Sequence, residues 1–268
     1  VSGDGRFILL GSSDDEIQLF DYDSGDDGYL WKYDVNQNIY EVAISKDGNY
    51  FAAITNDGSN SKLYFYKTNY TDDDADPVQQ WTYGFGDSIQ DVVISADGSY
   101  VAASSYSYVR VFQKGSSTPV IDISTSNNYD IAISGNGKYF ATCGNAYISF
   151  YSTSSSTPLW SHTETGYNCY SSNWGAALAI SDNGNYVALA TQNAYVKAFN
   201  ASTGTNILFY EQSTTYSVDL SSDGKYLVTA DYRYVRTYEL SSETDTYSPK
   251  WTSESMSWQI MDVDISAD

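Results

Sequence analysis

The stretch SKDGNYFAAI at residues 45–54 returns four more times along the chain with only modest changes. The other copies are SADGSYVAAS at 95–104, SGNGKYFATC at 134–143, SDNGNYVALA at 181–190 and SSDGKYLVTA at 221–230. Each copy opens on Ser and then has Gly preceded by Asp or Asn, a pair that suits the positive φ of a tight hairpin. An aromatic residue and small apolar residues follow, which predicts a strand that a neighbouring sheet can approach closely.

The recurring serine defines a repeat that runs through the whole chain. Its spacing varies between 39 and 50 residues, in the range of four-stranded propeller blades. Three further segments accompany the quoted one: an alternating segment before the Ser (EVAIS, DVVIS, DIAIS), an apolar–x–any–aromatic segment (IQLF, LYFY, VRVF) and a short edge strand that often carries Trp. The recurring serines, which we call anchors, are Ser2, Ser45, Ser95, Ser134, Ser181, Ser221 and Ser266. The edge-strand tryptophans are Trp31, Trp81, Trp160 and Trp251.

Short alternating strands, regular turns and the absence of helical periodicity predict an all-β chain. Six four-strand repeats predict a six-bladed β-propeller of antiparallel blades, forming one domain over residues 1–268. Residues 1–4 (VSGD) align with residues 265–268 (ISAD), so a strand at 259–265 is expected to complete the blade begun by residues 6–34 and to close the seam. The alternative is a slice of a longer tandem array.

The residues SADGSYVAAS, DVVIS and SSSTPLWSH (154–162) resemble the WD-repeat-like and quinoprotein-like propellers of secreted and surface proteins in archaea and bacteria. The resemblance spans all six repeats and implies the architecture, whereas propellers host binding, scaffolding and catalysis alike. The chain departs from true WD-repeats by lacking their Trp-Asp ending and their His. It departs from quinone-cofactor dehydrogenases by lacking an adjacent Cys pair.

Composition restricts the partners. The chain has 34 acidic and 13 basic residues, a formal net charge of −21, so nucleic acid and anionic membrane surfaces are disfavoured. No apolar run is long enough for membrane insertion. The Ser, Thr, Asn and Tyr content and two glycosylation sequences, at Asn69 and Asn200, suggest an extracellular or cell-surface glycoprotein. The chain begins at Val1, which is expected of a processed chain, a fragment or part of a longer one.

Catalytic groups are scarce. The only histidine, His162, cannot build a Ser-His-Asp site or a histidine-rich zinc site alone, so no catalytic residue is predicted. Carboxylates recur four residues before the anchor serine, where innermost strands would line a channel. They could hold a hard cation such as Ca²⁺, or each could accept hydrogen bonds from the neighbouring blade. These residues are Glu41, Asp91, Asp130 and Asp262.

Two acidic hairpins, the cysteine pair and one long insertion complete the candidates. Acidic clusters lie in hairpins at 21–27 and 72–76, as weak Ca²⁺ candidates or as solvated charge. Cys143 and Cys169 are the whole thiol content and could form a disulfide, although Cys143 occupies a column where a small buried residue suffices. The insertion 163–175 offers aromatic surfaces for a sugar or a protein, or packs as a cap over the channel. Its rings are Tyr167, Tyr170 and Trp174.

These observations favour a non-catalytic extracellular propeller with a structural or protein-interaction role and no cofactor. If the strand at 259–265 pairs with the first blade of a neighbouring molecule, copies would assemble head to tail into a filament or surface coat. The alternatives are a carbohydrate- or calcium-binding surface module and, third, a quinoprotein-like enzyme.

Overall fold

The computed structural model describes residues 1–24, 29–70, 76–169, 177–191, 195–211, 215–258 and 260–266. Regular structure in these ranges is almost entirely β-strand, and the helices are two three-residue 3-10 turns, Tyr22–Ser24 and Gly58–Asn60. None of the described helices has the length and apolar character to span a bilayer. The prediction of an all-β chain is confirmed. The chain divides into two compact units, Val1–Thr125 and Ser126–Asp268, which we describe separately.

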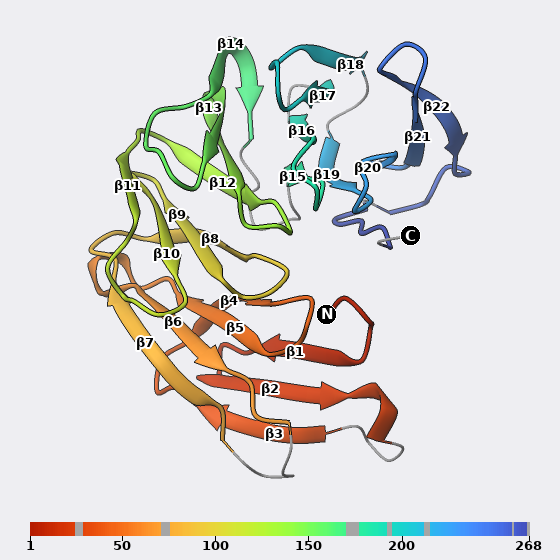
Figure 1. The fold of residues 1–268 in the computed structure, drawn as a ribbon. Helices are drawn as coiled ribbons and strands as arrows, with labels where there is room; N and C mark the ends of the chain where they lie inside the picture. Colours follow the sequence, from red (N-terminus) through yellow and green to blue (C-terminus); the bar gives the residue numbers. More distant parts are fainter. Residues whose placement is uncertain are drawn as a thin grey trace. The chain divides into compact units, whose positions relative to one another are not determined.

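The first unit contains three antiparallel sheets in chain order (Figure 1). The first sheet has three strands, β1 (Phe7–Gly11), β2 (Glu16–Asp21) and β3 (Tyr29–Asp34). The second has four, β4 (Ile39–Ile44), β5 (Tyr50–Thr55), β6 (Lys62–Lys67) and β7 (Val78–Gly84). The third also has four, β8 (Ile89–Ile94), β9 (Tyr100–Ser105), β10 (Tyr108–Gln113) and β11 (Ile121–Ser124).

The second unit repeats this plan. Its first sheet contains β12 (Asn128–Ile133), β13 (Tyr139–Ser152) and β14 (Trp160–Asn168). Its second contains β15 (Leu178–Ile180), β16 (Tyr186–Thr191), β17 (Tyr195–Asn200) and β18 (Asn206–Glu211). Its third contains β19 (Thr215–Leu220), β20 (Tyr226–Asp231), β21 (Val235–Ser241) and β22 (Thr246–Thr252).

The 14-residue β13 supplies two strands of its sheet. Its first half pairs with β12 and its second half with β14, on either side of Ala146, where φ is +71°. Phe140 and Tyr151 stack across the resulting hairpin with ring centroids 4.8 Å apart. Five of the six sheets therefore have the four-strand plan that the repeat predicts, and the sheet of β1–β3 has three described strands.

The anchor serine is the centre of a hydrogen-bonded turn. Ser45 is fully buried, and its Oγ donates to Asp47 Oδ1 (2.5 Å) and accepts from the backbone N–H of Tyr50 (3.0 Å). Gly48, with φ of +70°, donates its N–H to the Ser45 carbonyl (2.9 Å). The other turn glycines have φ between +66° and +75°. Burying a hydroxyl at this point is tolerated because its hydrogen bonds are satisfied inside the turn.

The hydrophobic cores lie between consecutive sheets within each unit. One core joins β1–β3 to β5 and β6, and the next joins β5–β7 to β8–β10. The second unit has two equivalent cores, on the two sides of the sheet β15–β18. The small side chains predicted for the second strand of each repeat, such as Ala52 and Ala103, are completely buried there. This face-to-face stacking is the arrangement of propeller blades, and we call each sheet a blade.

Candidate functional site

In the first unit the recurring carboxylates meet across two neighbouring blades. Glu41 on β4 accepts a hydrogen bond from the backbone N–H of Val92 on β8 (3.2 Å) and lies beside Asp91. Burial, followed by the charge of Asp91, raises the pKa of Glu41 well above its ordinary value. The Glu41 carboxyl thus lies between two innermost strands.

The second unit uses the same position in the same way. Asp130 on β12 accepts a hydrogen bond from the backbone N–H of Ala177 (2.6 Å), the residue that occupies the carboxylate position in the next repeat. At the equivalent position of β19, Ser217 donates its hydroxyl to Asp262 Oδ1 (2.6 Å). Each of these contacts joins the innermost segment of one repeat to that of the next. This is the structural role that the sequence allowed as the alternative to binding a cation.

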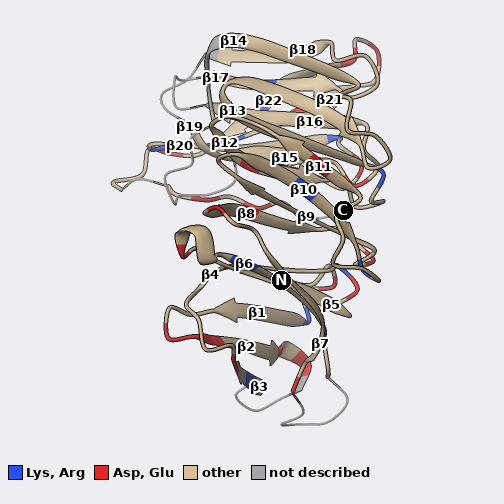
Figure 2. Cartoon of the chain, turned by 90° about the vertical axis from the view of Figure 1, so that its left-hand side faces the viewer, with Lys and Arg blue, Asp and Glu red and all other residues tan. Residues whose placement is uncertain are grey.

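The described residues contain no cluster of three or more His, Cys, Asp or Glu side chains arranged to hold a metal ion. Acidic residues lie in strands and loops along the described chain, and basic residues are fewer (Figure 2).

The C-terminal segment lies beside β19. Residues 260–266 form no regular strand, but their side chains keep a period of two, with Asp262 and Asp264 exposed. The backbone N–H of Val263 donates to Ser217 Oγ (3.3 Å), and that of Ile265 donates to Asp219 Oδ2 (3.0 Å). Side chains of β19 therefore hold the segment in place of a ladder of backbone hydrogen bonds. Gln259, the first residue of the predicted strand, lies outside the described residues.

The Asp219 carboxyl makes this contact sensitive to pH. Burial, followed by the neighbouring Asp264 carboxyl, raises the pKa of Asp219 to about 7. A carboxyl with a raised pKa stabilises the docked segment when protonated, and this stabilisation is lost as the pH rises from about 4 towards 7. We expect amide exchange at Ile265, corrected for intrinsic rates, to lose protection over this window. Asp219→Asn keeps an acceptor but cannot ionise, so it should flatten the profile; the same pH dependence in this variant would contradict the assignment.

Three tryptophans each donate a hydrogen bond that links their own blade to the next one, a contact that we call a latch. Trp31 donates its indole N–H to the Asn69 carbonyl (2.6 Å), Trp81 to the Lys114 carbonyl (3.0 Å) and Trp160 to the Ala201 carbonyl (2.7 Å). Each acceptor lies just beyond the third strand of the following blade. The sequence identified these tryptophans as edge-strand residues but did not predict the latch, because an indole hydrogen bond to a main-chain carbonyl leaves no mark on the sequence of the acceptor.

His162 supports the third latch. Its ring stacks on Phe199 with centroids 5.2 Å apart, and its Nε2 is hydrogen-bonded to the Gly204 carbonyl (2.7 Å). The histidine thus joins two blades.

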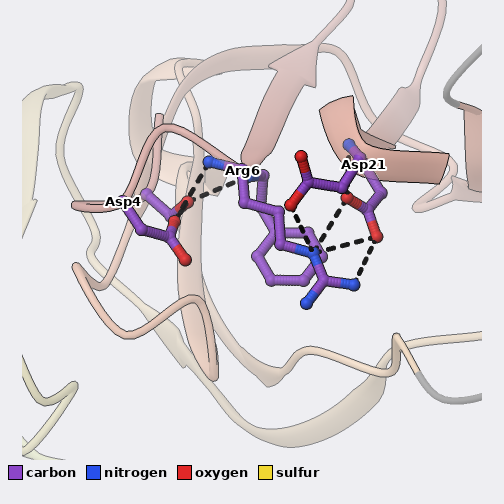
Figure 3. Close-up of polar contacts among 6 residues, drawn as sticks. Asp4, Arg6 and Asp21 are labelled. Carbon is purple, nitrogen blue, oxygen red and sulfur yellow. Dashed lines mark hydrogen bonds and ion pairs between the residues drawn. The ribbon is translucent and has the colours of Figure 1, made fainter. Parts of the chain in front are cut away.

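The acidic hairpin of the first blade contains a structural ion pair (Figure 3). Arg6 donates from Nε to Asp21 Oδ1 (2.9 Å) and from Nη2 to Asp21 Oδ2 (2.7 Å), while its backbone N–H donates to Asp4. The hydrogen bond from Arg6 is the main cause that lowers the pKa of the buried Asp21. Both carboxylate oxygens of Asp21 therefore accept hydrogen bonds from Arg6. The clustered acids at 26–27 and 72–74 lie outside the described residues.

Cys143 and Cys169 are joined by a disulfide, with Cα atoms 6.0 Å apart. Both are buried in the core between the blades β12–β14 and β15–β18. The cross-link therefore ties the segment after β14 to the core.

Removing the disulfide should destabilise the fold. It closes a loop of 26 residues, and the loss of that constraint on the unfolded chain corresponds to about 3 kcal/mol. We expect Cys143→Ala/Cys169→Ala to melt roughly 6–12 °C below the wild type. Wild-type protein treated with reductant is the matched sample, and equal melting temperatures with and without reductant would argue against the cross-link.

The remaining predicted residues are placed as follows. The Asn200 side chain donates to Asp245 (3.0 Å) and accepts from Ser202, the hydroxyl residue of its own glycosylation sequence. The backbone carbonyl of Asn69 accepts the hydrogen bond from the Trp31 indole. Tyr170 and Trp174 lie outside the described residues, as does the side chain of Tyr167, so the predicted aromatic face stays a prediction.

Comparison with known proteins identifies the fold. No protein-family model matches the chain, and no curated protein matches it. Among solved structures, the chain is similar to Sqt1 from Chaetomium thermophilum, a WD40 β-propeller protein, with a TM-score of 0.69 and 15% sequence identity. The match covers 88% of this chain and 66% of that one, so the chain spans just under two thirds of its length. At this identity the likeness shows a WD-repeat-like propeller fold alone.

Proposed function

We propose that the protein is a non-catalytic structural and interaction module at the cell surface or outside the cell, whose copies assemble through the C-terminal segment. Its similarity to a WD40 propeller is consistent with a protein-interaction scaffold. The acidic charge and the two glycosylation sequences support an extracellular setting.

One observation carries the proposal of self-assembly. Among the residues that the structure describes, the sheet β1–β2–β3 has no strand at the innermost position that β4, β8, β12, β15 and β19 fill in the other blades. The chain carries a further innermost-strand sequence, MDVDIS at 261–266, which forms no strand in the structure. A strand added to the open edge of β1 would satisfy its backbone groups, the general mode of β-strand addition. Supplied by a neighbouring copy, that strand would link molecules head to tail into a filament or coat.

The test uses the full chain with one residue changed in the segment. Asp264→Pro removes a backbone N–H that a paired strand would need, while leaving the N–H groups of Val263 and Ile265 that contact β19. We expect the wild type to form concentration-dependent oligomers in sedimentation velocity and filaments or sheets in electron micrographs. Asp264→Pro should stay monomeric, and the matched Asp264→Ala should assemble.

A wild-type chain that remains a monomer at the highest soluble concentration would overturn self-assembly. Equal assembly by the proline variant would overturn the role of the segment.

A further inference from the structure

Two turns of the second unit contain Asn directly before Gly, at Asn136–Gly137 and Asn183–Gly184, and the chain has no other Asn–Gly pair. This dipeptide carries its own chemistry, because glycine has no side chain to keep its backbone nitrogen away from the preceding Asn. When that nitrogen attacks the Asn Cγ, a bond from nitrogen to Cγ forms and the bond from Cγ to Nδ2 breaks. Ammonia leaves with the proton of the glycine N–H, and water then opens the cyclic imide to aspartate or isoaspartate.

The folded turn at Asn183 holds every group that would have to react. Asn183 Oδ1 accepts hydrogen bonds from Ser181 Oγ (2.8 Å) and from the backbone N–H of Asn185 (2.9 Å). Its Nδ2 donates to the Asp223 carbonyl (2.9 Å) in the next blade. The nitrogen that would attack, that of Gly184, donates its N–H to the Ser181 carbonyl (2.8 Å). The side-chain amide and the glycine N–H thus have separate partners, so the attack requires the turn to open first.

The turn at Asn136 repeats these contacts one blade earlier. Asn136 Oδ1 accepts hydrogen bonds from Ser134 Oγ (2.8 Å) and from the backbone N–H of Lys138 (3.0 Å). Gly137 donates its N–H to the Ser134 carbonyl (2.9 Å), and Asn136 Nδ2 donates to the Asn183 carbonyl (3.0 Å). The two side-chain amides therefore link the three blades of the second unit in sequence, and we call each of these Nδ2 hydrogen bonds a staple.

An aspartate at the same position in the first unit shows what would survive the conversion. Asp47 Oδ1 accepts hydrogen bonds from Ser45 Oγ (2.5 Å) and from the backbone N–H of Asn49 (3.0 Å), the same contacts inside the turn. A carboxylate has no N–H, so it cannot form the staple. Conversion of Asn to aspartate would therefore keep the turn and remove the staple. Isoaspartate would do more damage, because it adds a methylene group to the main chain inside the turn.

We propose that Asn136 and Asn183 are sites of self-modification, at which the following glycine nitrogen converts Asn to aspartate or isoaspartate when the turn and its staple open. Water is the only other reactant and ammonia is the product that leaves. Each conversion removes a hydrogen bond between two blades, so it weakens the second unit irreversibly with time. The inference is independent of the proposed self-assembly, because every group that it uses lies inside the second unit.

The first test follows both sites in the full chain by peptide mapping with mass spectrometry and an isoaspartate assay, with and without denaturant. We expect each site to react at least about 10-fold more slowly in the folded chain, because only the opened fraction can react. Ser181→Ala removes a hydrogen bond to Asn183 Oδ1 and should speed the reaction at Asn183 about 5-fold, with Asn136 unchanged. Ser134→Ala should do the reverse, so each variant is the matched control of the other. Circular dichroism and thermal melting verify that both variants fold.

The second test measures the effect of conversion on the blades by amide hydrogen exchange. Beside the staple, the backbone N–H of Asn183 donates to the Ser222 carbonyl of the next blade (3.3 Å). In Asn183→Asp, which keeps the turn but lacks the staple, we expect this N–H to exchange about 5-fold faster after correction for intrinsic rates. Asp47→Asn is the reciprocal variant. It supplies a side-chain donor in the first unit and should slow exchange of its own backbone N–H, which donates to the Ala96 carbonyl (3.2 Å).

The outcomes are distinct from those that test the proposed function. Slow reaction in the folded chain, fast reaction in denaturant and site-selective acceleration by the two serine variants support the proposal. Equal rates in the folded and denatured wild type overturn the protection by the turn, and a denatured chain that stays unmodified overturns the sites themselves. Unchanged exchange in Asn183→Asp overturns the effect on the blades. None of these results depends on whether copies of the chain assemble.

Discussion

Trp81→Ala should lower the free energy of unfolding by about 3–5 kcal/mol, the usual cost of removing a large buried aromatic side chain. Trp81 is buried, and its ring lies 5.1 Å from that of Phe65 in its own blade and 5.2 Å from that of Phe112 in the next. The variant also leaves the Lys114 carbonyl without its indole donor. The loss is thus a cavity between two blades together with an unsatisfied acceptor, measurable by denaturant unfolding.

Two variants separate these contributions. Trp81→Phe keeps a ring against Phe65 and Phe112 but removes the donor, and should cost about 1–3 kcal/mol. Trp258→Ala removes a tryptophan that is 85% exposed and should change stability by no more than about 0.5 kcal/mol. If Trp81→Ala were no more destabilising than Trp258→Ala, the latch would not hold the blades together.

Asp231→Ala should be comparably damaging, at about 3–5 kcal/mol, because it leaves a partly buried guanidinium without its counter-ion. Asp231, at the end of β20, is completely buried and forms an ion pair with Arg236. Its carboxylate also accepts hydrogen bonds from the backbone N–H groups of Arg233 (2.8 Å) and Tyr234 (2.7 Å). One carboxylate therefore fixes the turn from β20 to β21 and neutralises Arg236.

The pH dependence of this site follows from its pKa. Burial favours a higher pKa for Asp231, but the Arg236 hydrogen bond and the two backbone N–H groups outweigh it and the pKa is lowered. The stabilisation is therefore present above the pKa of the unfolded chain and is lost as the pH falls through the lower folded value. The stability difference between wild type and Asp231→Asn should shrink below about pH 4. Asp57→Ala, at an exposed aspartate with no capping hydrogen bond, is the control, and a pH-independent difference would contradict the ion-pair assignment.

Much of the architecture can be predicted from the sequence, because each repeat contains the residues that favour a tight turn and the period-two alternation that favours strands. Ser45, Gly48 and the small residues of β5 predict a turn, a strand and a close blade contact, and each is observed. These features are local, so a single repeat contains the information. The closed six-blade ring remains a prediction, because closure depends on how distant parts of the chain are placed.

The contacts between blades were the harder part to predict. The sequence identifies the carboxylate position of Glu41 and Asp130 and favours a contact with the neighbouring blade over a cation, but it does not specify the group that each carboxylate contacts. The latch of Trp81 was missed because its acceptor is a backbone carbonyl, which any residue can supply.

The latch has a consequence for how such a protein can change over evolutionary time. The blade β4–β7 accepts the Trp31 hydrogen bond at Asn69 and supplies the Trp81 hydrogen bond to Lys114, so the two junctions that flank it are alike in kind. A recombination event that duplicates or removes this repeat would join a compatible donor to a compatible acceptor and would need no compensating mutation in the latch at the new boundary. The number of blades can then change during evolution without any change in the surface residues that define what the protein contacts.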